Sequence, residues 1–155
     1  MLALADKAIA NKGMEYLVIH GVERILPDWG YQDFWPLKQT IFFAVLDGLA
    51  ERREKGKLWI TDHISQHQYE TERSTAEVRV LEAGEHAIRL ELKCKADPQY
   101  FDLPLTLVTQ VPPGWKQAFV TQGEKTLVVA VENGAVRYDA LPGELPIELE
   151  PAAGP

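Results

Sequence analysis

Two histidines and two carboxylates in the segment DHISQHQYE have the types and spacing of a metal site. His63 and His67 are four residues apart, so on a helix they lie on one face, which Glu70 joins one turn later. Two imidazoles and a carboxylate, with one position left open for water, suit zinc. We therefore predict a candidate divalent, zinc-like metal site at Asp62, His63, His67 and Glu70. The alternative is a polar, exposed face of a short helix.

A second candidate for chemistry is His20, which ends the apolar run Tyr16-Leu17-Val18-Ile19. Continuous apolar residues of this length are typical of a strand that is buried on both faces of a parallel sheet. Ligands of α/β folds bind outside the carboxyl ends of such strands, where His20 would lie and where Gly21 allows a sharp turn. A buried histidine with satisfied hydrogen bonds is the alternative interpretation.

Aromatic residues gather just after this predicted strand. Trp29, Tyr31, Phe34 and Trp35 fall within a short stretch, and aromatic faces suit the apolar faces of sugar rings. The cluster predicts a sugar-stacking platform, with a core or interface cluster as the alternative.

Composition excludes several function classes. The formal charge of −7 argues against a nucleic-acid or anionic membrane partner. The chain has no glycine-rich phosphate loop and no Gly-x-Ser-x-Gly motif, and its single Cys94 permits no internal disulfide. Apolar runs are too short for a membrane span. The N-terminus lacks a secretory signal, so we expect the chain as given to be cytoplasmic.

The first part of the chain has an α/β pattern. Helices are predicted near residues 2–12, at 33–55 with Asp33 as the N-cap, and from Thr61 or Asp62 to about Arg73. Strands are predicted at 16–19 and 57–61.

After Ser74 the apolar residues alternate with polar ones. Seven short strands are predicted, at 76–80, 88–92, 103–111, 117–121, 126–131, 135–140 and 147–150. Asn133-Gly134 is a strong hairpin signal. We predict an α+β fold: an incomplete α/β segment at 1–74, an antiparallel β-sandwich at 75–150 and a frayed tail at 151–155.

Two segments carry a family resemblance. GMEYLVIHGVE and KLWITDHISQHQYETERS, with the helix before and the aromatic-rich helix between them, resemble the C-terminal end of a polysaccharide deacetylase domain (the NodB-homology fold of carbohydrate esterase family 4). In that family the last catalytic motif is an apolar run that ends in histidine. The resemblance covers roughly residues 5–80, and a trailing β-sandwich occurs in some larger members.

The resemblance implies hydrolysis of acetyl groups from sugars by a metal-bound water, with His20 as the general acid and Val18 in place of a leucine that lines the acetyl pocket. Trp29 and Trp35 would contact the sugar. The family's paired aspartates and its metal-binding His-(Ser/Thr)-x-x-His motif do not occur in this chain. They are expected N-terminal to this sequence or in another chain.

Three functions therefore remain open. The chain is a carbohydrate esterase relative that is active only if His20 and the His63/His67 face, or a partner, build a metal site; a non-catalytic carbohydrate-binding module; or an oligomerisation module. An incomplete α/β part leaves apolar helix faces and a sheet edge uncovered, so we expect a homo-oligomer or a complementing segment.

Overall fold

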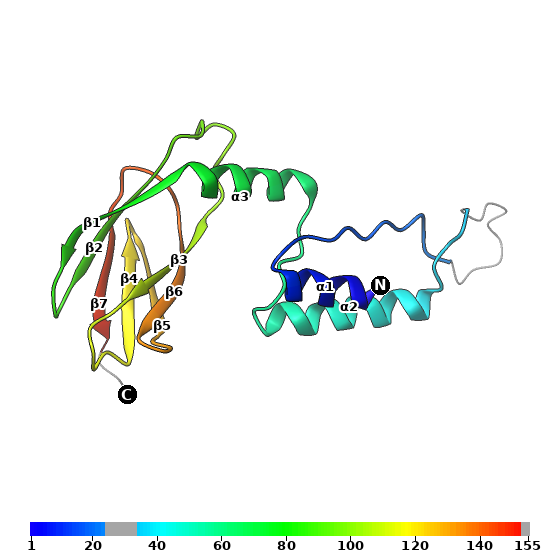
Figure 1. Cartoon of the computed structure of the whole chain (residues 1–155), viewed down its shortest axis with the longest axis horizontal. Helices are drawn as coiled ribbons and strands as arrows, with labels where there is room; N and C mark the ends of the chain where they lie inside the picture. Colours follow the sequence, from blue (N-terminus) through cyan, green and yellow to red (C-terminus); the bar gives the residue numbers. More distant parts are fainter. Residues whose placement is uncertain (24–33, 153–155) are drawn as a thin grey trace. The chain divides into compact units, whose positions relative to one another are not determined.

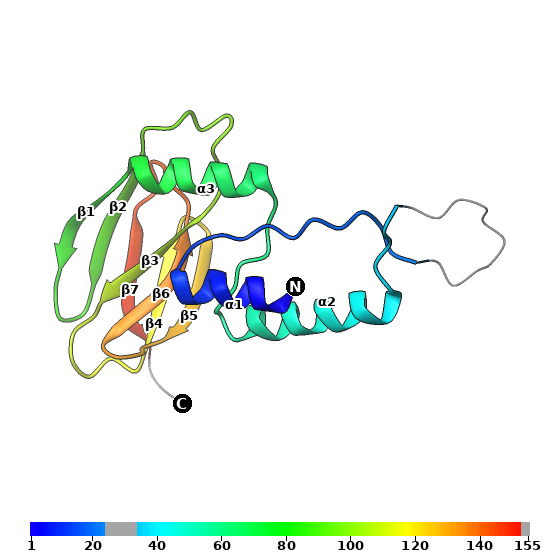
Figure 2. The ribbon, with the colours of Figure 1, turned by 45° about the vertical axis from the view of Figure 1, so that its right-hand side comes forward.

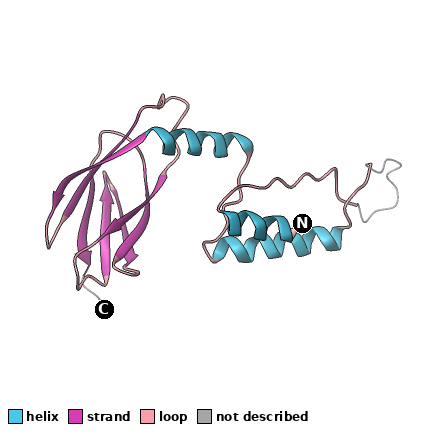
Figure 3. Ribbon diagram, in the orientation of Figure 1, coloured by secondary structure: helices cyan, strands magenta, loops and turns pink. Residues whose placement is uncertain are grey.

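A computed structural model of the chain describes residues 1–23 and 34–152. Within these residues three helices and seven strands form an α+β fold, and the strands make two antiparallel sheets (Figure 3). The predicted fold class and all seven predicted strands are thus present. The chain divides into two compact units, Met1–Thr61 and Asp62–Pro155, whereas the sequence placed the boundary after residue 74.

The first unit is built on two helices, α1 (Leu2–Asn11) and α2 (Gln39–Glu54), which lie side by side (Figures 1 and 2). Its core is small: Ala5, Val45 and Leu49 are buried, and three leucines pack against them, Leu2, Leu17 and Leu58. Gly48 makes the close approach of the helices possible. A Cβ added there would lie 2.6 Å from a methyl carbon of Leu2.

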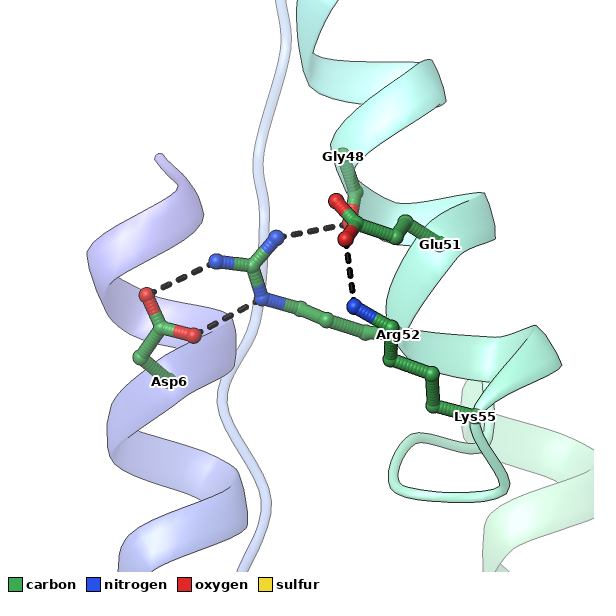
Figure 4. Close-up of polar contacts among 5 residues, drawn as sticks. All are labelled: Asp6, Gly48, Glu51, Arg52 and Lys55. Carbon is green, nitrogen blue, oxygen red and sulfur yellow. Dashed lines mark hydrogen bonds and ion pairs between the residues drawn. The ribbon is translucent and has the colours of Figure 1, made fainter.

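A bidentate ion pair joins the two helices (Figure 4). The Arg52 guanidinium donates to both carboxylate oxygens of Asp6, at 2.7 and 2.9 Å, and to the Gly48 carbonyl at 2.7 Å. The hydrogen bond from Arg52 holds the pKa of Asp6 below its ordinary value. Two parallel N–H···O bonds fix the orientation of the pair as well as its distance. The pair therefore sets how the two helices lie against each other.

Residues 14–20 differ from the sequence prediction. They run alongside the helices in extended form (Figure 1) but join no sheet within the described residues. Leu17 packs against the helices, while Tyr16 and Val18 are exposed, Val18 by 84%. The prediction of a strand buried on both faces is wrong for this chain, because among the described residues of this unit only the helices pack against the segment. The predicted strand at 57–61 is likewise absent, and Trp59 and Ile60 are about half exposed.

Helix α2 begins later than its predicted start. Its N-cap is Lys38, with no side-chain capping bond, and the predicted cap Asp33 lies outside the described residues. The reason is a backbone pairing: the Leu37 N–H donates to Gly21 at 2.8 Å and the Leu37 carbonyl accepts from Glu23 at 2.9 Å. These bonds hold residue 37 extended, so the helix can start only after it.

The second unit contains the two sheets. Five strands lie in the order β1-β2-β7-β4-β5 and two in the order β3-β6. Their bounds are β1 Ala76–Ala83, β2 Ile88–Cys94, β3 Leu105–Gln110, β4 Gln117–Gln122, β5 Lys125–Ala130, β6 Ala135–Ala140 and β7 Ile147–Ala152. Alternate side chains of both sheets enter one core, in which Leu92, Val136, Ile147 and Leu149 are fully buried. The architecture is therefore β-sandwich-like.

The turn predicted at Asn133-Gly134 forms, but it does not make a long hairpin. Both residues have positive φ, 51° and 76°, as a type I′ turn requires. The bridge between Glu132 and Ala135 closes the turn, with hydrogen bonds of 2.8 and 3.0 Å. The flanking strands β5 and β6 then separate into different sheets. The turn is thus a corner between the two layers.

Helix α3 (His63–Thr75) belongs to the second unit because a buried carboxylate and a half-buried tyrosine attach it to the strands. Tyr69 packs against the core. Glu72 is fully buried, and its Oε1 accepts the Leu103 backbone N–H at 3.0 Å. Its Oε2 has no hydrogen-bond partner. Burial raises the pKa of Glu72, and the nearby Asp102 adds to this effect, while the Leu103 bond opposes it.

The raised pKa of Glu72 makes stability depend on pH. Below the ordinary pKa of a glutamate, the carboxyl is neutral in the folded and the unfolded chain, so no charge is buried. As the pH rises through the folded-state pKa, the wild type must bury a charge and loses stability. E72Q stays neutral at every pH. We therefore expect the difference in free energy of unfolding between E72Q and the wild type to shift by about 1–3 kcal/mol in favour of E72Q as the pH rises from 4 to 8.

Urea unfolding followed by circular dichroism at several pH values measures this difference. The matched control is E124Q, at an exposed carboxylate of the β4–β5 turn, which we expect to follow the wild type. Parallel pH profiles for E72Q and the wild type would contradict a penalty for the buried charge.

Candidate functional site

His20 lies at the end of the extended segment 14–20, as predicted, but at the surface. The parallel bridge between Val22 and Leu37 brings the residues after His20 beside those that precede α2. This pairing places Trp35 next to the imidazole: their ring centroids are 6.4 Å apart and the rings are nearly perpendicular. The sequence predicted both residues as site residues, and the structure brings them together.

Phe34 and Trp35 extend this cluster. Their ring centroids are 4.5 Å apart, and both side chains are mostly exposed, Trp35 by 75%. Trp35 has a φ of 60°, which is rare for a bulky residue and costs on the order of 1–3 kcal/mol. Residues before proline are also restricted, and Pro36 follows. A strained backbone that holds an indole in solvent is a reason to look for a ligand there.

Two other predicted substrate residues have different outcomes. Val18 lies two residues before His20, and its side chain is exposed rather than inside a pocket. Trp29 lies outside the described residues. The surface that the structure does describe therefore consists of His20, Phe34 and Trp35.

The four residues predicted to bind a metal all lie at or in α3. His63 and His67 are one turn apart on this helix, as the spacing predicts. The His67 ring is in edge contact with Phe101, at a centroid distance of 6.5 Å. Over residues 1–23 and 34–152, no three His, Cys, Asp or Glu side chains form a group that could hold a metal ion.

Both carboxylates of the predicted metal set have other partners. Asp62 is the N-cap of α3: its carboxylate accepts the Ser65 backbone N–H at 2.8 Å and the Ser65 hydroxyl at 3.2 Å. The hydrogen bond from the Ser65 backbone N–H is the main reason that the pKa of Asp62 lies below its ordinary value. Glu70 pairs with Arg73 at 3.5 Å. The structure therefore gives Asp62 and Glu70 roles in the helix itself, and the metal site stays a prediction.

The burial of Glu72 was not predicted from the sequence. A signal for it exists in the sequence. Tyr69, Glu72 and Ala76 follow a helical spacing of three and four, so Glu72 shares the face that packs on the strands. Its carboxylate is enclosed between α3 and the residues before β3, and it supports the fold rather than an open site.

His20, Phe34 and Trp35 thus form an exposed surface that combines an imidazole with two aromatic rings. An imidazole can donate or accept a proton, and the two adjacent aromatic rings can stack on an apolar ligand face.

No helix in the described parts of the chain has the length and apolar character needed to cross a membrane. Comparison with known proteins finds no family model, no curated protein and no solved structure that matches this chain.

Proposed function

We propose that this chain forms part of a carbohydrate deacetylase-like protein of the polysaccharide deacetylase type, and that a further polypeptide segment completes its catalytic site. The observation that carries the proposal is the extended segment 14–20, which ends at His20 and is covered on one side only. Leu17 faces the helices, whereas Val18 faces solvent. In an α/β sheet, helices cover one face of each strand and neighbouring strands pair with its edges. An apolar extended segment that is covered by helices on one face is therefore expected where the neighbouring strands belong to another polypeptide segment.

Helix α2 supports the same proposal. Its side chains Val45 and Leu49 are buried, but three large apolar side chains are about half exposed, Ile41, Phe43 and Leu46. Phe43 and Leu46 are three residues apart and share one face of the helix, and exposed apolar surface of this kind is typical of an interaction site. A polypeptide that paired with residues 14–20 and packed on α2 would bury both surfaces.

In the proposed reaction, water adds to the acetyl carbonyl and the bond from the acetyl carbon to the sugar nitrogen or oxygen breaks. A general base in the completing segment takes a proton from the water, His20 donates a proton to the departing sugar atom, and acetate is released. Among the described residues Asp62 and Glu70 already have partners within α3, and no three His, Cys, Asp or Glu side chains form a group that could hold a metal ion. We therefore assign no metal step to this chain.

A non-catalytic carbohydrate-binding function is the second candidate. It is favoured by the exposed ring pair Phe34 and Trp35, which presents aromatic faces beside His20 without needing a metal. Both functions share a sugar ligand at this surface, and they differ in whether the bond to the acetyl group is broken.

Trp35→Ala tests the sugar surface. We expect an N-acetylglucosamine oligomer to quench tryptophan fluorescence in the wild type. We expect W35A to weaken its binding roughly five- to tenfold, because one stacked ring is lost. Trp59→Ala is the matched control, since Trp59 is an exposed tryptophan of the same unit. Equal affinities of W35A and W59A would contradict a binding role for Trp35.

Catalysis is tested by acetate release from the same oligomer. We expect the chain alone to release no acetate above the buffer rate, with or without added Zn²⁺, because no group of three His, Cys, Asp or Glu side chains among its described residues is placed to hold a metal ion. Acetate release that stops on adding a chelator or in His20→Gln would show instead that this chain holds a complete site.

The predicted metal site is tested separately by titration with Zn²⁺ in a calorimeter. The prediction requires one tightly bound Zn²⁺ per chain and loss of this binding in the double variant H63A/H67A. The matched control is H86A, at an exposed histidine of the β1–β2 turn. Equal Zn²⁺ binding by the wild type and H63A/H67A would exclude a site on α3.

A further inference from the structure

Strand β1 is an edge of the five-stranded sheet with apolar residues on its inner face. In the register of the β1–β2 pair, Val78 lies opposite Leu92 and Val80 opposite Leu90. Both leucines are buried in the core, so the two valines face the same side of the sheet. Yet Val78 is 47% exposed and Val80 is 60% exposed. The two-stranded sheet β3-β6 therefore covers the sheet at β2 but not at β1.

The same residues present free backbone groups at the edge. Thr75 lies directly opposite Lys95, and its carbonyl accepts the Lys95 N–H at 3.4 Å. Backbone groups alternate sides along an antiparallel strand. Glu77 and Arg79 therefore direct their backbone groups toward β2, and Ala76, Val78 and Val80 direct theirs away from it. An edge of this kind is a template for another strand.

The regular part of this edge has a defined centre. It begins at Ala76, where α3 ends, and it stops after Val80, where the register shifts at a bulge. An antiparallel partner with the same sequence uses all five residues in one register only, with Val78 opposite Val78 on a two-fold axis. In this register Ala76 lies opposite Val80 of the other copy. The N–H and C=O groups that point away from β2 in one copy therefore face the same groups of the other copy and can form hydrogen bonds with them.

Charge favours the same register. With Val78 on the axis, Glu77 of each copy lies opposite Arg79 of the other, on the outer face of the sheet. The neighbouring strand continues the alternation, because Glu77 pairs with Lys93 and Arg79 with Glu91. Sliding the second copy by two residues in either direction instead places Glu77 opposite Glu77 or Arg79 opposite Arg79. Like charges directly opposite each other are destabilising.

Space is available along this edge within the unit. In Figures 1 and 2, α3 leaves β1 on the side of β2 and β3, away from the free edge. The exposed inner valines would meet their counterparts across the axis and form one apolar strip.

We propose that two copies of this chain associate through antiparallel pairing of their β1 strands about Val78, which joins the two five-stranded sheets into one. Five residues per strand make a small interface, so the association is weak and depends on concentration. The proposal rests on the second unit alone and does not depend on the carbohydrate function.

The test uses two charge variants of the full chain, E77R and R79E. Alone, each variant places like charges opposite each other at both outer pairs. Mixed, they place opposite charges there, because E77R is cationic at both positions and R79E is anionic at both. We expect sedimentation velocity to give roughly tenfold tighter association in the mixture than in either variant alone. The wild type should associate about as tightly as the mixture.

Effects on folding and association through other surfaces are the same in the separate and mixed samples, so the comparison isolates the β1 edge. A second variant, Val78→Lys, puts a charge on the axis and should abolish association. Val128→Lys, at an exposed valine of the opposite edge strand β5, should leave it unchanged. The proposal is overturned if the wild type stays monomeric, or if the mixture associates no more tightly than its components.

Discussion

An apolar sheet face must be covered by a second layer, and the structure of the second unit depends on how far that cover extends. The five-stranded sheet buries Leu92, Ile147 and Leu149 against the two-stranded sheet, which contributes Val136 and Tyr138. A layer of two strands is too narrow for a layer of five. The side chains at the centre of the larger sheet are therefore buried from solvent, whereas Val78 and Val80 on the same face of β1 are about half exposed. Complete cover at the centre gives the fold, and incomplete cover at the edge gives a surface for association.

The first unit shows the same constraint in a more extreme form. Its helices supply one layer, and the extended segment 14–20 supplies a single chain of the next. Only three residues are buried in this core, so much of its order comes from polar links such as the bidentate Asp6–Arg52 pair and the backbone bonds of Leu37. These links also explain the exposed aromatic surface. The Leu37 bonds bring His20 and Trp35 together, and both side chains are exposed.

Polar groups have opposite roles in the two units. In the first unit, Asp6 and Arg52 are oppositely charged and form two hydrogen bonds with each other. Glu72 is fully buried with one unpaired oxygen, and such a group costs stability when it is charged. Its bond to Leu103 nevertheless ties α3 to the residues before β3, so this helix belongs structurally to the strands that follow it.

The sequence by itself determined the elements whose signals are local. Two-residue alternation located all seven strands, and the Asn133-Gly134 pair located a turn with positive φ. Asp62, the cap of α3, was one of the two residues predicted for that position. It also identified His20 and Trp35 as neighbours in one site. Each of these features follows from a few adjacent residues, or from the chemistry of one side chain.

Only the tertiary structure decided what covers each element. The apolar run 16–19 has the composition of a buried strand, but its burial depends on strands and helices from other parts of the chain. In the described part of the first unit, the helices alone pack against this run. The spacing of His63 and His67 was read correctly, yet their carboxylate partners are engaged in capping and in an ion pair. Periodicity reports which face of an element is apolar. Whether another layer lies on that face is decided by the number and width of the layers, which no local pattern contains.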